Sequence, residues 1–174
     1  PAFGWGAAAG HAPAVPLAVR GLAKAFGGRP LFTDQTFDLA RGERLAVVGP
    51  NGAGKTTLAR LLLVLLAPDA GTATLAPRVK AGWFGQAAEQ LDPQASALAN
   101  ALAAGGEPAR ARLLLACLRL RGERVFEPVS RLSAGERAVV ALARLLLAEP
   151  DVVVLDEPTN HLDLPAREAM EATL

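Results

Sequence analysis

The fold is decided by the stretch Gly49-Pro50-Asn51-Gly52-Ala53-Gly54-Lys55-Thr56-Thr57. It has the spacing of a phosphate-binding loop: a glycine, four residues, then Gly-Lys-Thr. Glycines let backbone N–H groups turn inward around a polyphosphate, because no Cβ blocks the required φ/ψ angles. Lys55 supplies a positive charge for the β- and γ-phosphates, and the Thr56 hydroxyl is a ligand for Mg²⁺. The stretch therefore predicts a site for a nucleotide and its metal.

The residues on either side supply the context that such a loop requires, a buried strand before it and a helix after it. Arg44–Val48 is an apolar run with β-branched residues, which predicts the strand. Thr57–Leu66 is apolar and of helical length, and it stops just before Pro68. The competing interpretation, a glycine-rich turn with a surface lysine, explains neither flank.

Composition limits the class of protein. The chain has 174 residues, enough for one domain, and 51% are hydrophobic, mainly alanine and leucine. The longest apolar run, Leu61–Ala67, is far short of the roughly 20 residues that a spanning helix needs, so we expect no membrane insertion. One cysteine allows no internal disulfide, which fits a cytoplasmic location. The net charge of +1 argues neither for nor against nucleic acid as a partner.

The remaining pattern predicts an α/β fold with added subdomains. Residues 1–16 are rich in Ala, Gly and Pro and are expected to be a linker. Residues 17–48 alternate as antiparallel strands, and two more strands follow at Thr72–Leu75 and Val79–Phe84. From about 87 to 145 the pattern becomes helical. We therefore expect a parallel-sheet core, an N-terminal antiparallel β subdomain and an inserted helical subdomain.

Helix signals mark this insert. Ala95–Ala103 and Pro108–Arg121 have helical spacing. Ser133 and Glu136 have the spacing of a capping box, so a helix should begin there. Capping does not explain Gly135, which costs about 1 kcal/mol in a helix relative to alanine. That glycine suggests a close approach to the backbone.

Two adjacent carboxylates follow the apolar run from Val152 to Leu155. Such a run predicts a strand buried on both faces, hence parallel and central. Ligands of open α/β sheets bind at the carboxyl ends of the strands. Asp156 is placed to hold Mg²⁺ through water, and Glu157 to orient or deprotonate an attacking water. The alternative is a pair of surface acids at a strand end.

Two further candidates stay open on spacing alone. Phe26 precedes a Gly-Gly turn, and it is either a hydrophobic plug or an exposed ring that stacks on a base. Gln86 ends a predicted strand. It is either a surface residue or a side chain delivered toward the phosphate site.

Taken in order, these elements resemble the ATP-binding-cassette ATPases over residues 17–174, which implies a P-loop NTPase core with ATP and Mg²⁺ as cofactors. The matching segments are Gly49–Thr56 for Walker A, Gln86 for the Q-loop, Leu132-Ser133-Ala134-Gly135-Glu136 for the signature, Val152–Glu157 for Walker B, His161-Leu162-Asp163 for the D-loop, and Phe26 for the adenine-stacking aromatic.

The resemblance implies roles that the residues alone do not. ATP lies between two cassettes, so the signature and D-loop act in trans at a partner's ATP. The residues concerned are Ser133, Ala134, Gly135, Glu136 and Asp163. Gln86 is implied as a catalytic and metal-binding residue beside Glu157. Two residues differ mildly from the usual signature of the family: Ala134 replaces a common glycine, and Glu136 replaces a common glutamine.

Within this family, the stretches Leu132–Arg137 and Asp156–Leu164 resemble those of the ABC-F group. That group consists of soluble proteins with two cassettes in one chain, many of which act on the ribosome. This chain is more similar to a second cassette than to a first. The chain ends before the family's switch histidine, so we interpret it as a piece of a longer protein and expect the piece alone to bind ATP weakly and to show poor or no hydrolysis. The alternatives are the ATP-binding subunit of a membrane transporter and a nucleotide sensor.

Overall fold

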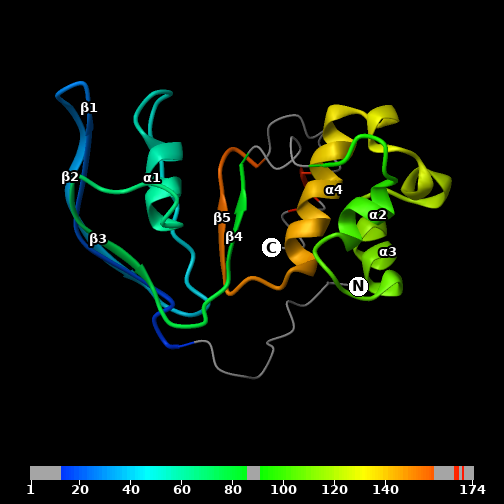
Figure 1. The fold of residues 1–174 in the computed structure, drawn as a ribbon, viewed down its shortest axis with the longest axis horizontal. Helices are drawn as coiled ribbons and strands as arrows, with labels where there is room; N and C mark the ends of the chain where they lie inside the picture. Colours follow the sequence, from blue (N-terminus) through cyan, green and yellow to red (C-terminus); the bar gives the residue numbers. More distant parts are fainter. Residues whose placement is uncertain (1–12, 86–90, 159–166, 169, 171–174) are drawn as a thin grey trace. The chain divides into compact units, whose positions relative to one another are not determined.

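The computed structural model describes residues 13–85, 91–158, 167, 168 and 170 (Figure 1). Its contacts divide the chain into two compact units. The loop unit comprises His11–Trp83 and Pro150–Asp156, and the helical unit comprises Phe84–Glu149 with the described residues from Glu157 onward. No helix in the described ranges is long and apolar enough to cross a bilayer.

An antiparallel sheet forms one part of the loop unit. Its strand order is β2-β1-β3, with β1 at Leu17–Phe26, β2 at Arg29–Leu39 and β3 at Ala70–Leu75. Leu17 of the central strand β1 pairs with Leu39 of β2 on one side and with Leu75 of β3 on the other. The sequence predicted these antiparallel strands, although β1 and β2 run longer than their apolar alternation indicated.

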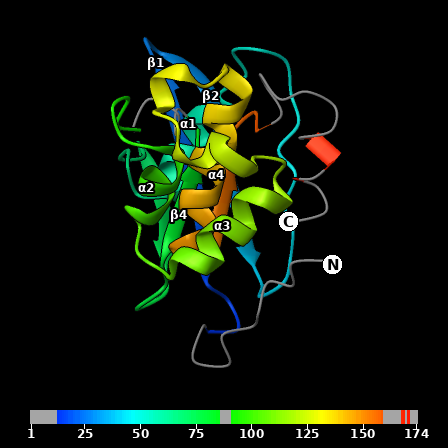
Figure 2. The same cartoon turned by 90° about the vertical axis from the view of Figure 1, so that its right-hand side faces the viewer.

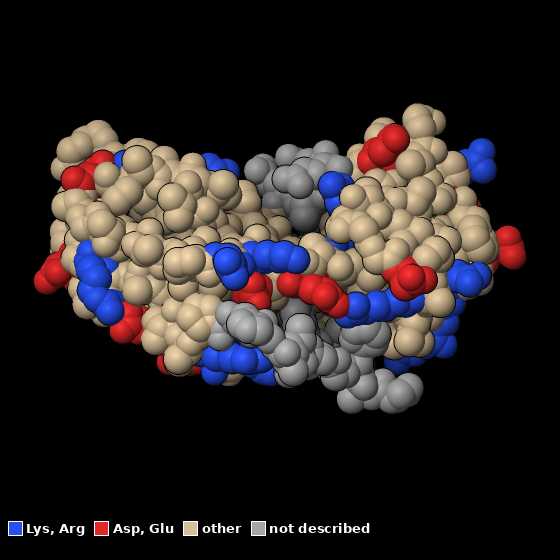
Figure 3. Space-filling view, turned by 60° about the horizontal axis from the view of Figure 1, so that its bottom comes forward, with Lys and Arg blue, Asp and Glu red and all other residues tan. Residues whose placement is uncertain are grey.

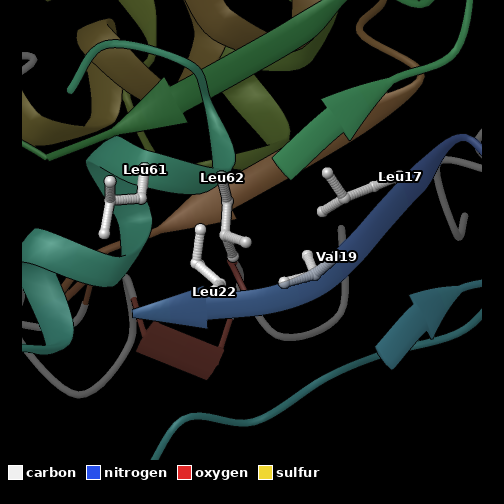
Figure 4. Packing of buried hydrophobic residues seen from close by; sticks show 5 residues of the cluster. All are labelled: Leu17, Val19, Leu22, Leu61 and Leu62. Carbon is white, nitrogen blue, oxygen red and sulfur yellow. The ribbon is translucent and has the colours of Figure 1, made fainter. Parts of the chain in front are cut away.

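Helix α1, Lys55–Leu62, packs on this sheet. Leu17, Val19 and Leu22 of β1 are buried against Leu61 and Leu62, and Figure 4 shows Leu62 of α1 pointing toward Leu22. Burying a leucine side chain contributes about 1.5–3 kcal/mol. This cluster therefore fixes the helix, and with it the loop from which the helix begins.

Strands β4, Ala81–Phe84, and β5, Val152–Leu155, form a second sheet. The carbonyl of Lys80 accepts from the N–H groups of Asp151 and Val152, at 2.8 and 3.1 Å. The Asp151 carboxylate accepts from the Lys80 N–H at 2.8 Å. Both strands start at these linked residues and run away from them, so the pair is parallel. The expected α/β class with a parallel sheet is confirmed.

Three expectations about this unit were wrong. Arg44–Val48 forms no strand and belongs to neither sheet; Val48 is 92% exposed. In the described part of the chain β5 pairs with β4 alone, and of β5 only Val152 is fully buried. Helix α1 stops at Leu62 instead of Leu66.

The early end of α1 has a clear physical cause. Val64 has a φ of 57°, the left-handed conformation. Its N–H donates to the Leu61 carbonyl, and the next N–H, of Leu65, donates to the Arg60 carbonyl. These two bonds form a Schellman motif, which usually has glycine at this position. Because Val64 is β-branched and not a typical residue at a helix end, the sequence did not predict that α1 ends here.

The helical unit packs α2, Ala97–Leu102, and α3, Pro108–Cys117, against α4, Ala134–Leu147 (Figure 2). Ala97 and Ala101 of α2 are completely buried. Two 3-10 turns, η2 at Gly122–Phe126 and η3 at Val129–Arg131, lead into α4.

Gly71 of β3 gives a direct test of the β1–β3 packing. A Cβ at Gly71 would lie 2.1 Å from the Gly21 carbonyl oxygen, and φ is 74°. We expect Gly71→Ala to lower the free energy of unfolding by about 2–5 kcal/mol in urea titrations. Gly28→Ala is the matched control, because φ is 77° with open space around the added Cβ. It should cost about 1–2 kcal/mol. Equal losses would contradict the packing.

Candidate functional site

The loop Gly49–Thr57 has the backbone conformation that its glycines predicted. Gly52 and Gly54 both have left-handed φ angles, 81° and 94°. Gly54 is also the N-cap of α1, and a Cβ there would lie 2.9 Å from the Leu31 side chain. Only glycine meets both conditions without displacing its neighbour.

The start of α1 leaves its first N–H groups available to an anion. Gly54 offers no side-chain cap, and the first turn contains no acidic residue. The N–H groups of Lys55, Thr56 and Thr57 fall in the part of a helix that has no intrahelical acceptor. Together with the positive end of the helix dipole they form an anion-binding end.

The Lys55 side chain folds back over the loop. Its ammonium donates to the carbonyls of Gly49 and Pro50 at 3.0 and 3.1 Å. The ammonium therefore lies against the loop that precedes the anion-binding end of α1. This geometry places the positive charge of Lys55 on the loop that leads into α1, and its contact with phosphates stays a prediction.

The two carboxylates at the end of β5 belong to different units. Asp156 is half-buried and lies in the loop unit, whereas Glu157 is exposed and is assigned to the helical unit. Glu157 has a φ of 48°, a conformation that costs a non-glycine residue of order 1 kcal/mol. Such strain is concentrated at functional sites, which keeps Glu157 a candidate.

The oxygen donors present suit Mg²⁺. Thr56 at the start of α1 is exposed, and Asp156 lies in the same unit. In the described ranges no three His, Cys, Asp or Glu side chains gather into a metal-holding cluster. A protein that supplies one hydroxyl and one carboxylate fits a Mg²⁺ that arrives on a nucleotide phosphate, because Mg²⁺ keeps several waters.

The predicted capping box is present at the start of α4. The Ser133 hydroxyl accepts from the Glu136 N–H at 3.2 Å, and the Glu136 carboxylate accepts from the Ser133 N–H at 2.8 Å. Ala134 and Gly135 form the first turn between them. The segment is therefore held in one conformation by two reciprocal bonds.

Arg124 was missed by the sequence analysis. Its guanidinium donates to both oxygens of Glu136, at 2.6–3.0 Å, and to Glu127 at 2.8 Å. Burial raises the pKa of Glu136, but hydrogen bonds from Arg124 and Ser133 outweigh burial and leave that pKa below its usual value. No sequence pattern distinguishes this arginine from the other arginines of the insert.

Phe26 lies at the end of β1 and is 53% exposed. The Lys24 ammonium is 5.5 Å from the ring centroid and forms a 2.7 Å ion pair with Asp69. A half-exposed ring whose surroundings are held by an ion pair fits the stacking interpretation better than the buried plug. Gln86 and Asp163 lie outside the described residues.

Comparisons with known proteins agree on one family. The profile of the family described as "ABC transporter" matches residues 32–160. The chain is 37% identical over 162 residues to the ribosome protection protein VmlR of Bacillus subtilis, covering 91% of this chain and 29% of that protein. It is 38% identical over 202 residues to the phosphonates import ATP-binding protein PhnC of Anaeromyxobacter dehalogenans, covering 100% and 40%.

A solved structure supports the fold. The dimeric ATP-binding cassette MJ0796 bound to ADP and Pi matches with a TM-score of 0.73 and 23% identity, covering 90% of this chain and 80% of that one. The chain spans less than half the length of the curated relatives VmlR and PhnC.

Lys55 allows the loop to be tested by itself. Replacing Lys55 with alanine removes the ammonium over the loop, so we expect affinity for ATP to fall about 10- to 100-fold in calorimetric titrations. Lys80→Ala removes the same charge from an exposed position outside the loop and should leave the affinity unchanged. Equal affinities for all three proteins would rule out the loop as the phosphate site.

Proposed function

We propose, since this chain belongs to the ABC transporter family, that it is one cassette of an ABC-F-type ATPase, working with a second cassette on the ribosome. The observation that carries the nucleotide part is the uncapped start of α1 with the Lys55 ammonium folded over its loop. The ABC-F part is supported by the likeness to VmlR and by the Asp-Glu-Pro-Thr-Asn-His-Leu-Asp-Leu wording.

The chemistry follows from the donors. The N–H groups at the start of α1 and the ammonium of Lys55 hold the β- and γ-phosphates. Thr56 and Asp156 would hold a Mg²⁺ ion, which would supply positive charge to the phosphate oxygens. Glu157 orients a water in line with the γ-phosphorus and accepts its proton, so the water oxygen bonds to phosphorus as the bond to ADP breaks. Gln86 is proposed to help hold the metal and the water.

The site needs a second cassette. The start of α4 offers the Ser133 hydroxyl and the N–H groups of Ala134 and Gly135, at the positive end of a helix dipole. We assign these groups, with Glu136 and Asp163, to the ATP held by the other cassette. The match to a cassette solved as a dimer is consistent with this arrangement.

The competing function is the ATP-binding subunit of a membrane transporter. It is favoured by the match to PhnC over the whole chain. Within each of the two units, the described surface shown in Figure 3 has both acidic and basic side chains.

Co-sedimentation of the intact protein with ribosomes separates the two functions. Glu157→Gln removes the proposed base but keeps the phosphate site, so it should trap the ATP-bound state and increase ribosome binding in the presence of ATP. Glu107→Gln changes an exposed acid at the start of α3 in the same way and should behave as the parent.

Two results would contradict these assignments. A Glu157→Gln protein that hydrolyses ATP at the parental rate would remove Glu157 as the base. If the ATP-bound Glu157→Gln protein does not bind ribosomes but binds membranes that contain a permease, the transporter function would be favoured.

A further inference from the structure

Arg124 lies in η2, ahead of the helix whose first turn it contacts. Its Nε and Nη2 donate to Oε1 of Glu136 at 3.0 and 2.7 Å, and Nη2 also reaches Oε2 at 2.6 Å. Its remaining Nη1 donates to Glu127 at 2.8 Å. Such multiple charge-assisted bonds fix a guanidinium and a carboxylate in one relative orientation.

Both carboxylate oxygens of Glu136 are therefore engaged. Among the described residues, Oε1 accepts hydrogen bonds from Arg124 only, whereas Oε2 accepts from both Arg124 and the Ser133 N–H. Arg137, next along α4, donates to the Leu132 carbonyl at 2.7 Å and so holds the residue that precedes Ser133. The bonds of these two arginines brace the segment from Leu132 to Glu136.

The charge of Glu136 creates a conflict. A carboxylate suits a capping box and the positive end of a helix dipole. The same negative charge opposes an incoming phosphate at that end. A glutamine in this position would cap the helix without the charge. Glu136 therefore needs a cation to offset it if the turn is to receive an anion.

We propose that Arg124 is a positioning residue for ATP hydrolysis, which holds Glu136 in the capping box and offsets its charge so that the Ser133-Ala134-Gly135 turn accepts the γ-phosphate of the other cassette's ATP. The inference rests on the proposed function. Arg124 does not touch the nucleotide in this account. It acts through Glu136.

Steady-state ATP hydrolysis by the intact protein tests the role. Arg124→Ala leaves the Glu136 charge uncompensated, so kcat/KM should fall about 5- to 30-fold, the size of a charge effect at a helix end. Affinity for ADP should not change, because ADP binds the Lys55 loop and has no γ-phosphate. Arg131→Ala is the control; it removes an exposed charge two residues before Ser133 and should match the parent.

The decisive variant is the double substitution Arg124→Ala/Glu136→Gln. Removing the negative charge should restore kcat/KM at least about fivefold over Arg124→Ala. Arg124→Lys, which keeps the charge but loses the bidentate geometry, should lie between the parent and Arg124→Ala.

The outcomes separate two failures. If the double variant stays as slow as Arg124→Ala, while the parent is active, Arg124 has only a packing role and the inference is overturned. A loss of ADP affinity in Arg124→Ala would also overturn it. If the parent protein binds ADP but hydrolyses no ATP, the proposed function itself fails and the inference fails with it.

Discussion

The uncapped start of α1 is the feature on which the other parts depend. A helix leaves its first N–H groups without acceptors, and here neither a capping side chain nor a first-turn acid satisfies them. Leaving these N–H groups without hydrogen-bond acceptors costs free energy. Packing at the other end of the helix offsets that cost, because Leu61 and Leu62 are buried against β1. The sheet therefore stabilises the helix whose first turn is left for a ligand.

The start of α4 meets the same constraint in the opposite way. Ser133 and Glu136 satisfy its first donors reciprocally, and Arg124 holds the carboxylate from outside the helix. The start of α1 is thus uncapped and lies beside Lys55. The start of α4 is held by its capping box, and the charge of Glu136 is compensated by Arg124. This difference fits the two roles that we propose, in which the start of α1 holds a nucleotide and the start of α4 contacts a nucleotide held by another cassette.

Sequence reasoning predicted the features that rest on local chemistry. The glycine conformations of the loop, the capping box and proline at the start of α3 all follow from which backbone angles and donors a residue type permits. It failed where a residue departs from the usual type, as with Val64 ending α1. It also failed where the outcome depends on distant partners. Arg44–Val48 has the composition of a strand but pairs with neither sheet, and the Arg124–Glu136 contact has no periodic signal.

We propose that Gly49–Thr57 forms one half of a nucleotide site whose other half is the Ser133-Ala134-Gly135 turn of a second cassette. A structure of the intact protein with Mg²⁺ and ATP tests it most directly, through the groups around the γ-phosphate. The account predicts the Lys55 ammonium on one side of that phosphate and, on the other, the Ser133 hydroxyl or its counterpart from the other cassette. A γ-phosphate bound away from the loop, or contacted by Lys55 and Ser133 of one cassette, would contradict it.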